Sequence, residues 1–94
     1  KEISIILPDG GNTIVSDADT TITWNSVNVA DVKIEYTLDD GQNWTVIVAS
    51  TPANAGSYTW SVPNVTSNQC MIRITDASDV NVYDKSDGVF TISP

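Results

Sequence analysis

The sequence predicts an all-β fold: an immunoglobulin-like antiparallel β-sandwich of about seven strands. Three observations predict it. Short stretches rich in Ile, Val, Thr, Trp and Tyr alternate between apolar and polar residues with a period of two. Turn-forming residues separate these stretches at intervals of roughly 8 to 15 residues. No stretch shows the periodicity of an amphipathic helix.

The predicted strands follow one another along the chain as short segments. Their bounds are Glu2–Leu7, Thr20–Trp24, Asp31–Tyr36, Trp44–Val48, Ser57–Val62, Gln69–Thr75 and Val89–Ile92. The first strand ends at the turn residues Pro8-Asp9-Gly10-Gly11. The fifth ends at Pro63, because proline cannot donate to a β-ladder. Residues 39–43 carry an Asp-Gly turn that joins the third and fourth strands as a hairpin.

The alternation assigns one face of each strand to the core. The residues expected to face inward are Ile22, Trp24, Val32, Ile34, Tyr36, Tyr58, Trp60, Val62, Cys70, Ile72, Ile74, Phe90 and Ile92. Lys33, Glu35 and Arg73 fall on an outward face, where the two basic side chains can pair with Glu35 across strands. Trp44, beside the turn, and Tyr83, in the polar stretch before the last strand, are the aromatic residues expected to be exposed.

Length and composition narrow the classes of function. The 94 residues are enough for one domain, 1–94, and the start at Lys1 suggests a piece of a larger secreted protein. A net charge of −8 argues against nucleic acid and anionic lipid as partners. There is no His, which removes the commonest general base, and one Cys, which leaves no intrachain disulfide. No apolar run is long enough to insert into a membrane.

Five motifs stand in order along the chain and together resemble a known family. They are Ile22–Ser26, Val32–Tyr36 with Asp40-Gly41 and Trp44, Gly56–Pro63, Cys70–Ile74, and Asp87–Ile92. They resemble the Ig-like or fibronectin-III-like module of bacterial secreted multidomain proteins, and are similar to the Ser/Thr-rich, GPI-anchored family of cell-wall proteins. The resemblance implies a non-catalytic module, secreted or at the cell surface, whose partners are the neighbouring domains of its parent chain.

The segment from Thr37 to Trp44 resembles an Asp-box hairpin. In such a hairpin the Asp side chain accepts backbone N–H bonds across the turn, Gly takes a positive φ, and Trp packs over the loop. The same segment holds the candidate carbohydrate site: Trp44 as a stacking platform, with Asp39, Asp40 and Gln42 as hydrogen-bonding groups.

A second candidate site is acidic. Asp76, Asp79, Asp84 and Asp87 lie in the region before the last strand, which is expected to be a loop. Calcium takes six to eight oxygen ligands, often from loop carboxylates, so it is the one cofactor that this spacing suggests. No EF-hand or nonapeptide calcium repeat is present.

The sequence favours a non-enzymatic accessory module that spaces and presents neighbouring domains or binds a ligand. Three alternatives stay open. One is a carbohydrate-binding module attached to a glycoside hydrolase, with a polysaccharide as partner. Another is an adhesion repeat rigidified by calcium. The last is a small hydrolase using paired carboxylates, for which a domain of this size leaves little room.

Overall fold

The computed structural model describes the whole chain, residues 1–94, as nine β-strands and one short 3-10 helix. The elements are β1 (Glu2–Leu7), β2 (Thr13–Val15), β3 (Asp19–Val27), β4 (Asp31–Thr37), β5 (Thr45–Pro52), η1 (Ala53–Ala55), β6 (Ser57–Ser61), β7 (Ser67–Asp76), β8 (Asp79–Lys85) and β9 (Phe90–Ser93).

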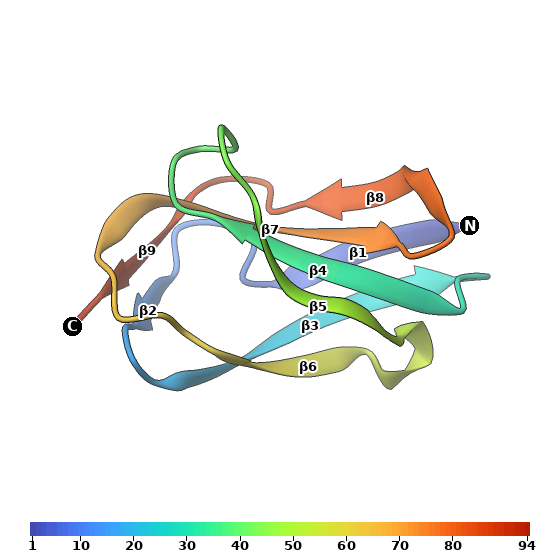
Figure 1. The fold of residues 1–94 in the computed structure, drawn as a ribbon, viewed down its shortest axis with the longest axis horizontal. Coiled ribbons are helices and arrows are strands. Elements are labelled where there is room, and N and C mark those ends of the chain that lie inside the picture. The colour runs from blue at the N-terminus through green and yellow to red at the C-terminus, as the bar shows by residue number, and fades with distance from the viewer.

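The strands form two sheets packed face to face (Figure 1). One sheet has the order β1-β3-β6. The other follows the path β2-β9-β7-β4-β5, and β8 also pairs with β7. All neighbours are antiparallel except β2 and β9, which run parallel. The predicted all-β sandwich is therefore confirmed.

The strand count differs from the expected seven because of β2 and β8. β2 has only three residues, too few to show an alternation. β8 was expected to be a loop, because most of its residues are polar. Four of its seven side chains are exposed, as suits an edge strand. Both β8 and β9 pair with β7: Lys85 lies opposite Arg73, and Phe90 lies opposite Cys70. They are two parts of one strand interrupted at residues 86–89.

Buried Ser86 holds this interruption together. Its backbone N–H donates to the carbonyl of Ile72 over 2.9 Å, and its hydroxyl donates to the carbonyl of Pro8 over 2.8 Å. The hydroxyl also accepts the N–H of Ile72 over 3.0 Å. The predicted turn after β1 packs on the same place, since a Cβ at Gly10 would lie 3.1 Å from the backbone of Gly88. Only glycine suits that approach.

The core lies between the two sheets and matches the predicted inward faces closely. Its twelve buried members are Ile22, Trp24, Val32, Ile34, Ala53, Trp60, Val62, Cys70, Ile72, Ile74, Phe90 and Ile92. The predicted members Tyr36 and Tyr58 are only partly buried and pack against this cluster. Burial raises the pKa of the Cys70 thiol, which keeps it in the neutral form of a small core residue.

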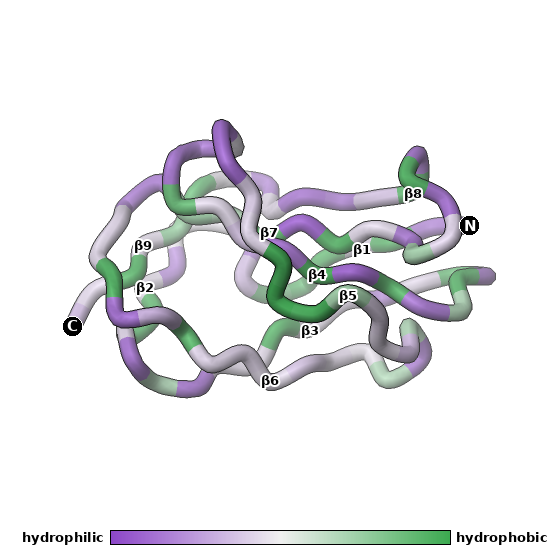
Figure 2. Tube along the Cα trace, in the orientation of Figure 1, coloured by the Kyte–Doolittle hydropathy of each residue, from purple (hydrophilic) through white to green (hydrophobic).

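The two ends of the chain lie at opposite ends of the long axis, which measures 37 Å (Figure 1). The hairpin between β4 and β5 projects from the body of the molecule, and its tip is hydrophilic, whereas the following part of β5 is apolar (Figure 2). No helix of the structure has the length and apolar character needed to cross a membrane.

Candidate functional site

The outward face of β4, β7 and β8 arranges polar side chains in two rows. In one row, Lys33 on β4 pairs with Thr75 on β7, and Thr75 pairs with Tyr83 on β8. Next to it, Glu35, Arg73 and Lys85 form the second row in the same way. Residues two apart on a strand share a face, so both rows lie on the side away from the core.

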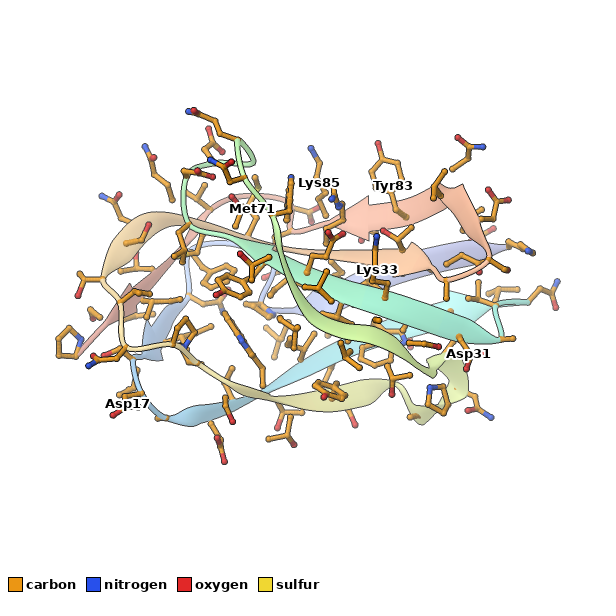
Figure 3. All side chains as sticks on the ribbon, in the orientation of Figure 1. Asp17, Asp31, Lys33, Met71, Tyr83 and Lys85 are labelled. Carbon is orange, nitrogen blue, oxygen red and sulfur yellow. The ribbon has the colours of Figure 1, made fainter.

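These rows form the floor of a groove of about 510 Å³, here called the outer groove. It is lined by Lys33, Glu35, Asp40, Gly41, Trp44, Arg73, Thr75, Val80, Tyr83 and Lys85. Figure 3 shows Lys33, Tyr83 and Lys85 on one side of the molecule, contributed by β4 and β8. The hairpin between β4 and β5 supplies Asp40, Gly41 and Trp44 at one end of the groove.

The hairpin has the hydrogen bonds expected of an Asp-box. Asp39 Oδ1 accepts the hydroxyl of Thr37 over 2.7 Å and the backbone N–H of Asn43 over 2.9 Å. Asn43 Nδ2 donates to Asp39 Oδ2 over 2.7 Å, and Gly41 N donates to Thr37 Oγ1 over 3.0 Å. Asn43, which stands where the usual motif has Thr, thus adds a bond of its own.

The turn also directs Trp44 toward the groove. Gly41 has φ of 90°, and a Cβ placed on it would lie 3.6 Å from the Trp44 ring, so the ring packs on the turn as predicted. Asp40, with φ of 59°, takes the left-handed conformation that Asp and Asn tolerate best among residues with a side chain. The turn conformation therefore determines where Trp44 and Asp40 lie.

The hydrogen bonds of the turn act on the acidity of Asp39. The side chains of Asn43 and Thr37 and the backbone N–H of Asn43 bond to the ionised carboxylate, and they lower the pKa of Asp39 from 3.8 to about 2. A lowered folded-state pKa means that the ionised group stabilises the fold at neutral pH, and that this contribution is lost as the pH falls from about 4 to about 2.

We therefore expect the gap in melting temperature between the wild type and Asp39→Asn to narrow between pH 6 and pH 2. Thermal unfolding followed by circular dichroism at several pH values measures this gap. Asp40→Asn is the matched control, because the Asp40 carboxylate makes no hydrogen bond within the turn. A gap for Asp39→Asn that is equally wide at both pH values would contradict the assignment.

Arg73 lies at the centre of the outer groove and is fixed on two sides. Its Nε and Nη2 atoms donate to Glu35 Oε1 over 3.1 and 3.0 Å. Its guanidinium carbon lies 4.2 Å from the centroid of the Trp44 ring, a cation–π contact. Lys33 Nζ lies 3.8 Å from the same Glu35 oxygen. The predicted pairing of Lys33 and Arg73 with Glu35 is thus present.

Glu35 was expected on an exposed face but is buried, with only 6% of its surface accessible. Arg73 and Lys33 both reach its carboxylate from neighbouring positions of the sheet. A buried carboxylate needs such partners, because an ionised group loses its hydration on burial. The acid therefore holds the two cations in place.

The structure brings together only part of the predicted carbohydrate site. Trp44 is partly exposed, as expected, and it lines the outer groove together with Asp40. Asp39 is engaged in the hydrogen bonds of the turn, and Gln42 is exposed outside the groove lining. Tyr83 is 52% exposed and also lies in the groove, although no sequence pattern joins it to Trp44.

The four acidic residues of the predicted calcium site belong to different elements and make different contacts. Asp79 and Asp84 are in β8 rather than a loop, and Asp87 lies in the interruption before β9. Asp84 Oδ2 accepts the backbone N–H of Ile5 over 2.8 Å, which ties β8 to β1 of the other sheet. No group of three or more acidic, His or Cys side chains in the structure could hold a metal ion.

Asp76 has partners of its own. Its Oδ1 accepts the N–H and the hydroxyl of Ser78 over 2.9 and 2.8 Å, and Lys1 Nζ lies 3.2 Å from Oδ2. The two bonds from Ser78, with a smaller effect of Lys1, lower the pKa of Asp76. These contacts organise the turn between β7 and β8.

Comparisons with protein-family models, with curated proteins and with solved structures found no match to this chain. The resemblance to Ig-like modules of secreted proteins stays a prediction.

Proposed function

We propose that this chain is a non-catalytic, immunoglobulin-like accessory module of an exported multidomain protein, and that it binds a polysaccharide through the outer groove. The observation that carries the proposal is a pair of aromatic side chains within one groove: Tyr83 from β8 and Trp44 from the hairpin between β4 and β5. Sugar rings stack their C–H faces on aromatic rings, while neighbouring polar groups bond to the hydroxyls.

The strand order supports the immunoglobulin-like assignment. When β8 and β9 are counted as one strand and β2 as an extension of β1, seven strands remain. In the usual letters, β1, β3 and β6 are then A, B and E, and they face a sheet with the order G-F-C-C′. The lettering matches the seven strands expected from the sequence.

Tyr83 is the better stacking platform of the two aromatic residues. It lies on the edge strand β8, with half of its surface exposed. The ring of Trp44 already carries the guanidinium of Arg73 at 4.2 Å. We therefore assign Tyr83 to direct sugar contact and Trp44 to the support of Arg73 and the groove wall.

The acidic side chains of the groove support a binding role over hydrolysis. Glycoside hydrolysis needs one carboxyl group to donate a proton and a second to act as base or nucleophile. The Glu35 carboxylate is instead held by Arg73 and Lys33, and Asp40 is the only other acid in the groove. The groove therefore offers no pair of free carboxyl groups.

The position of the chain ends supports a second role, the separation of neighbouring domains. The two ends lie at opposite ends of the 37 Å axis, so domains attached to both would be held apart by about the length of the sandwich. The hydrogen-bonded sheets make such a spacer stiff compared with a flexible linker.

We expect Tyr83→Ala to weaken polysaccharide binding at least about fivefold, since an aromatic contact contributes roughly 1 kcal/mol. Affinity electrophoresis and pull-down against cellulose, xylan, mannan, chitin, β-glucans and uronic-acid polymers provide the measurement. Tyr83→Phe keeps the ring and should keep most of the affinity.

Val15→Ala is the surface control, because Val15 is 58% exposed and lies outside the outer groove. It should bind as the wild type does, and all variants should melt at similar temperatures. Wild-type protein that none of these polysaccharides retains would contradict the binding role and leave the spacer role alone.

A further inference from the structure

The basic side chains of this acidic protein are concentrated in one place. The chain has four Lys and Arg residues and twelve Asp and Glu residues. Three of the four basic residues line the outer groove, namely Lys33, Arg73 and Lys85, against two of the twelve acidic ones. The groove is thus the part of the surface with a local excess of positive charge.

We propose that the outer groove binds a carboxylate-bearing sugar, a uronic acid unit of an acidic polysaccharide. The proposal rests on the function proposed above, that the groove binds polysaccharide, and adds the chemical class of the ligand. In this assignment Arg73 and Lys85 bind the sugar carboxylate, and Tyr83 contacts the ring.

Arg73 is prepared for this role before any ligand arrives. Glu35 takes two of its donors and the Trp44 ring supports the guanidinium plane, while Nη1 is not used by any hydrogen bond within the protein. A guanidinium that is already ordered loses little conformational freedom on binding, and its planar fork suits a carboxylate.

Lys85 provides the second charge. It lies directly opposite Arg73 across the β7–β8 ladder and takes part in none of the three ion pairs of the structure. Directly opposite residues have Cβ atoms roughly 5 Å apart, so both side chains can reach one carboxylate. The single charge on Glu35 is already shared by Arg73 and Lys33, which leaves Lys85 without an internal counterion.

The modest local charge favours single, spaced carboxylates over a dense polyanion. Glu35 and Asp40 lie within the same groove, and the chain as a whole carries −8. A nucleic acid or a heavily sulfated chain would meet repulsion from the rest of the surface. A uronic acid polymer brings one charge per uronic acid unit, together with hydroxyls that can donate hydrogen bonds to exposed Asp40 and a ring face that can stack on Tyr83.

The test compares each acidic polymer with its own uncharged form. Isothermal titration calorimetry is run with polygalacturonate, alginate and hyaluronan, and with the same polymers after their carboxylates have been esterified or reduced. We expect at least one acidic polymer to bind the wild type, and neutralisation of that polymer to weaken binding about tenfold, the size of one charge-assisted hydrogen bond.

Lys85→Gln and Lys1→Gln are the matched variants, since they change the net charge equally and only Lys85 lies in the groove. Lys85→Gln should weaken binding of the acidic polymer about tenfold and leave the uncharged form unaffected, whereas Lys1→Gln should change neither by more than about twofold. A shallower dependence of affinity on salt should accompany Lys85→Gln.

Three results would overturn the inference, and they differ in what they say about the proposed function. Retention of a neutral glycan through Tyr83, with no preference for any acidic polymer and no effect of Lys85→Gln, refutes the carboxylate while polysaccharide binding stands. No binding of any polymer, acidic or neutral, refutes both. Equal losses in Lys85→Gln and Lys1→Gln would also refute the inference, because general charge attraction would then explain the binding.

Discussion

Trp24→Ala is expected to destabilise the domain by about 4 kcal/mol, the usual range for removing a fully buried aromatic side chain from a core. Trp24 is 2% exposed and lies in the core between the two sheets. Its Nε1 atom also donates to the carbonyl of Ala53 over 3.0 Å, which ties β3 to the 3-10 helix. Because domains of this size are stable by about 5 to 15 kcal/mol, the change removes a large share of the stability.

Urea denaturation followed by fluorescence and circular dichroism measures the difference. Trp24→Phe is the informative companion, since it keeps an apolar ring in the core while it loses the indole N–H and part of the ring volume. The Ala53 carbonyl retains the hydroxyl of Ser26 at 3.4 Å, so we expect Trp24→Phe to cost about 1 to 2 kcal/mol. If both variants had the same urea midpoint of unfolding as the wild type, the assignment of Trp24 to the core would be wrong.

The second large effect is expected for Arg73→Ala, at about 2 to 3 kcal/mol. Removing one partner of a buried ion pair leaves the other charge buried, which costs about 3 to 5 kcal/mol in enclosed sites. The side chain of Glu35 is 8% exposed and that of Arg73 is 29% exposed, so water partly screens the pair and the expected loss falls just below the range for enclosed sites. Lys33, at 3.8 Å, compensates for only a part of the loss.

A double-mutant cycle with Glu35→Gln separates this charge effect from lost packing. If the pair is coupled, Arg73→Ala should cost about 1 to 2 kcal/mol less in the Glu35→Gln background than in the wild type. Costs that simply add would show that the Arg73 side chain stabilises by its contact with Trp44 alone. The outcome also bears on ligand binding, since Glu35 is the residue proposed to hold Arg73 ready.

Strand alternation predicts the core position of Trp24 but does not predict β8. The place of Trp24 in the core follows from the alternation of Thr20–Trp24, because a sheet with one buried face repeats every second residue. The same reasoning located Ile34, Ile72 and Phe90. It failed for β8, where the inward positions hold Val82 and Asp84, and where Asp84 is used to bond the other sheet. An edge strand with one apolar inward residue has no pattern to detect.

The sequence by itself determined the all-β sandwich, most of the core and the internal structure of the hairpin between β4 and β5. These features are local: an alternation within one strand, or hydrogen bonds that Thr37 and Asp39 share with residues no more than four positions away. Short-range interactions of this kind depend on residue types at fixed spacings, and these spacings can be read directly from the sequence.

The tertiary structure alone decided the outer groove. Lys33, Arg73 and Lys85 come from three strands, and their meeting depends on the register of β4 against β7 and of β7 against β8. A shift of one residue in either register would turn a whole strand's side chains to the other face. Such a register is set by the packing of the buried face, so a binding surface on the opposite face becomes visible only once the core has been assembled.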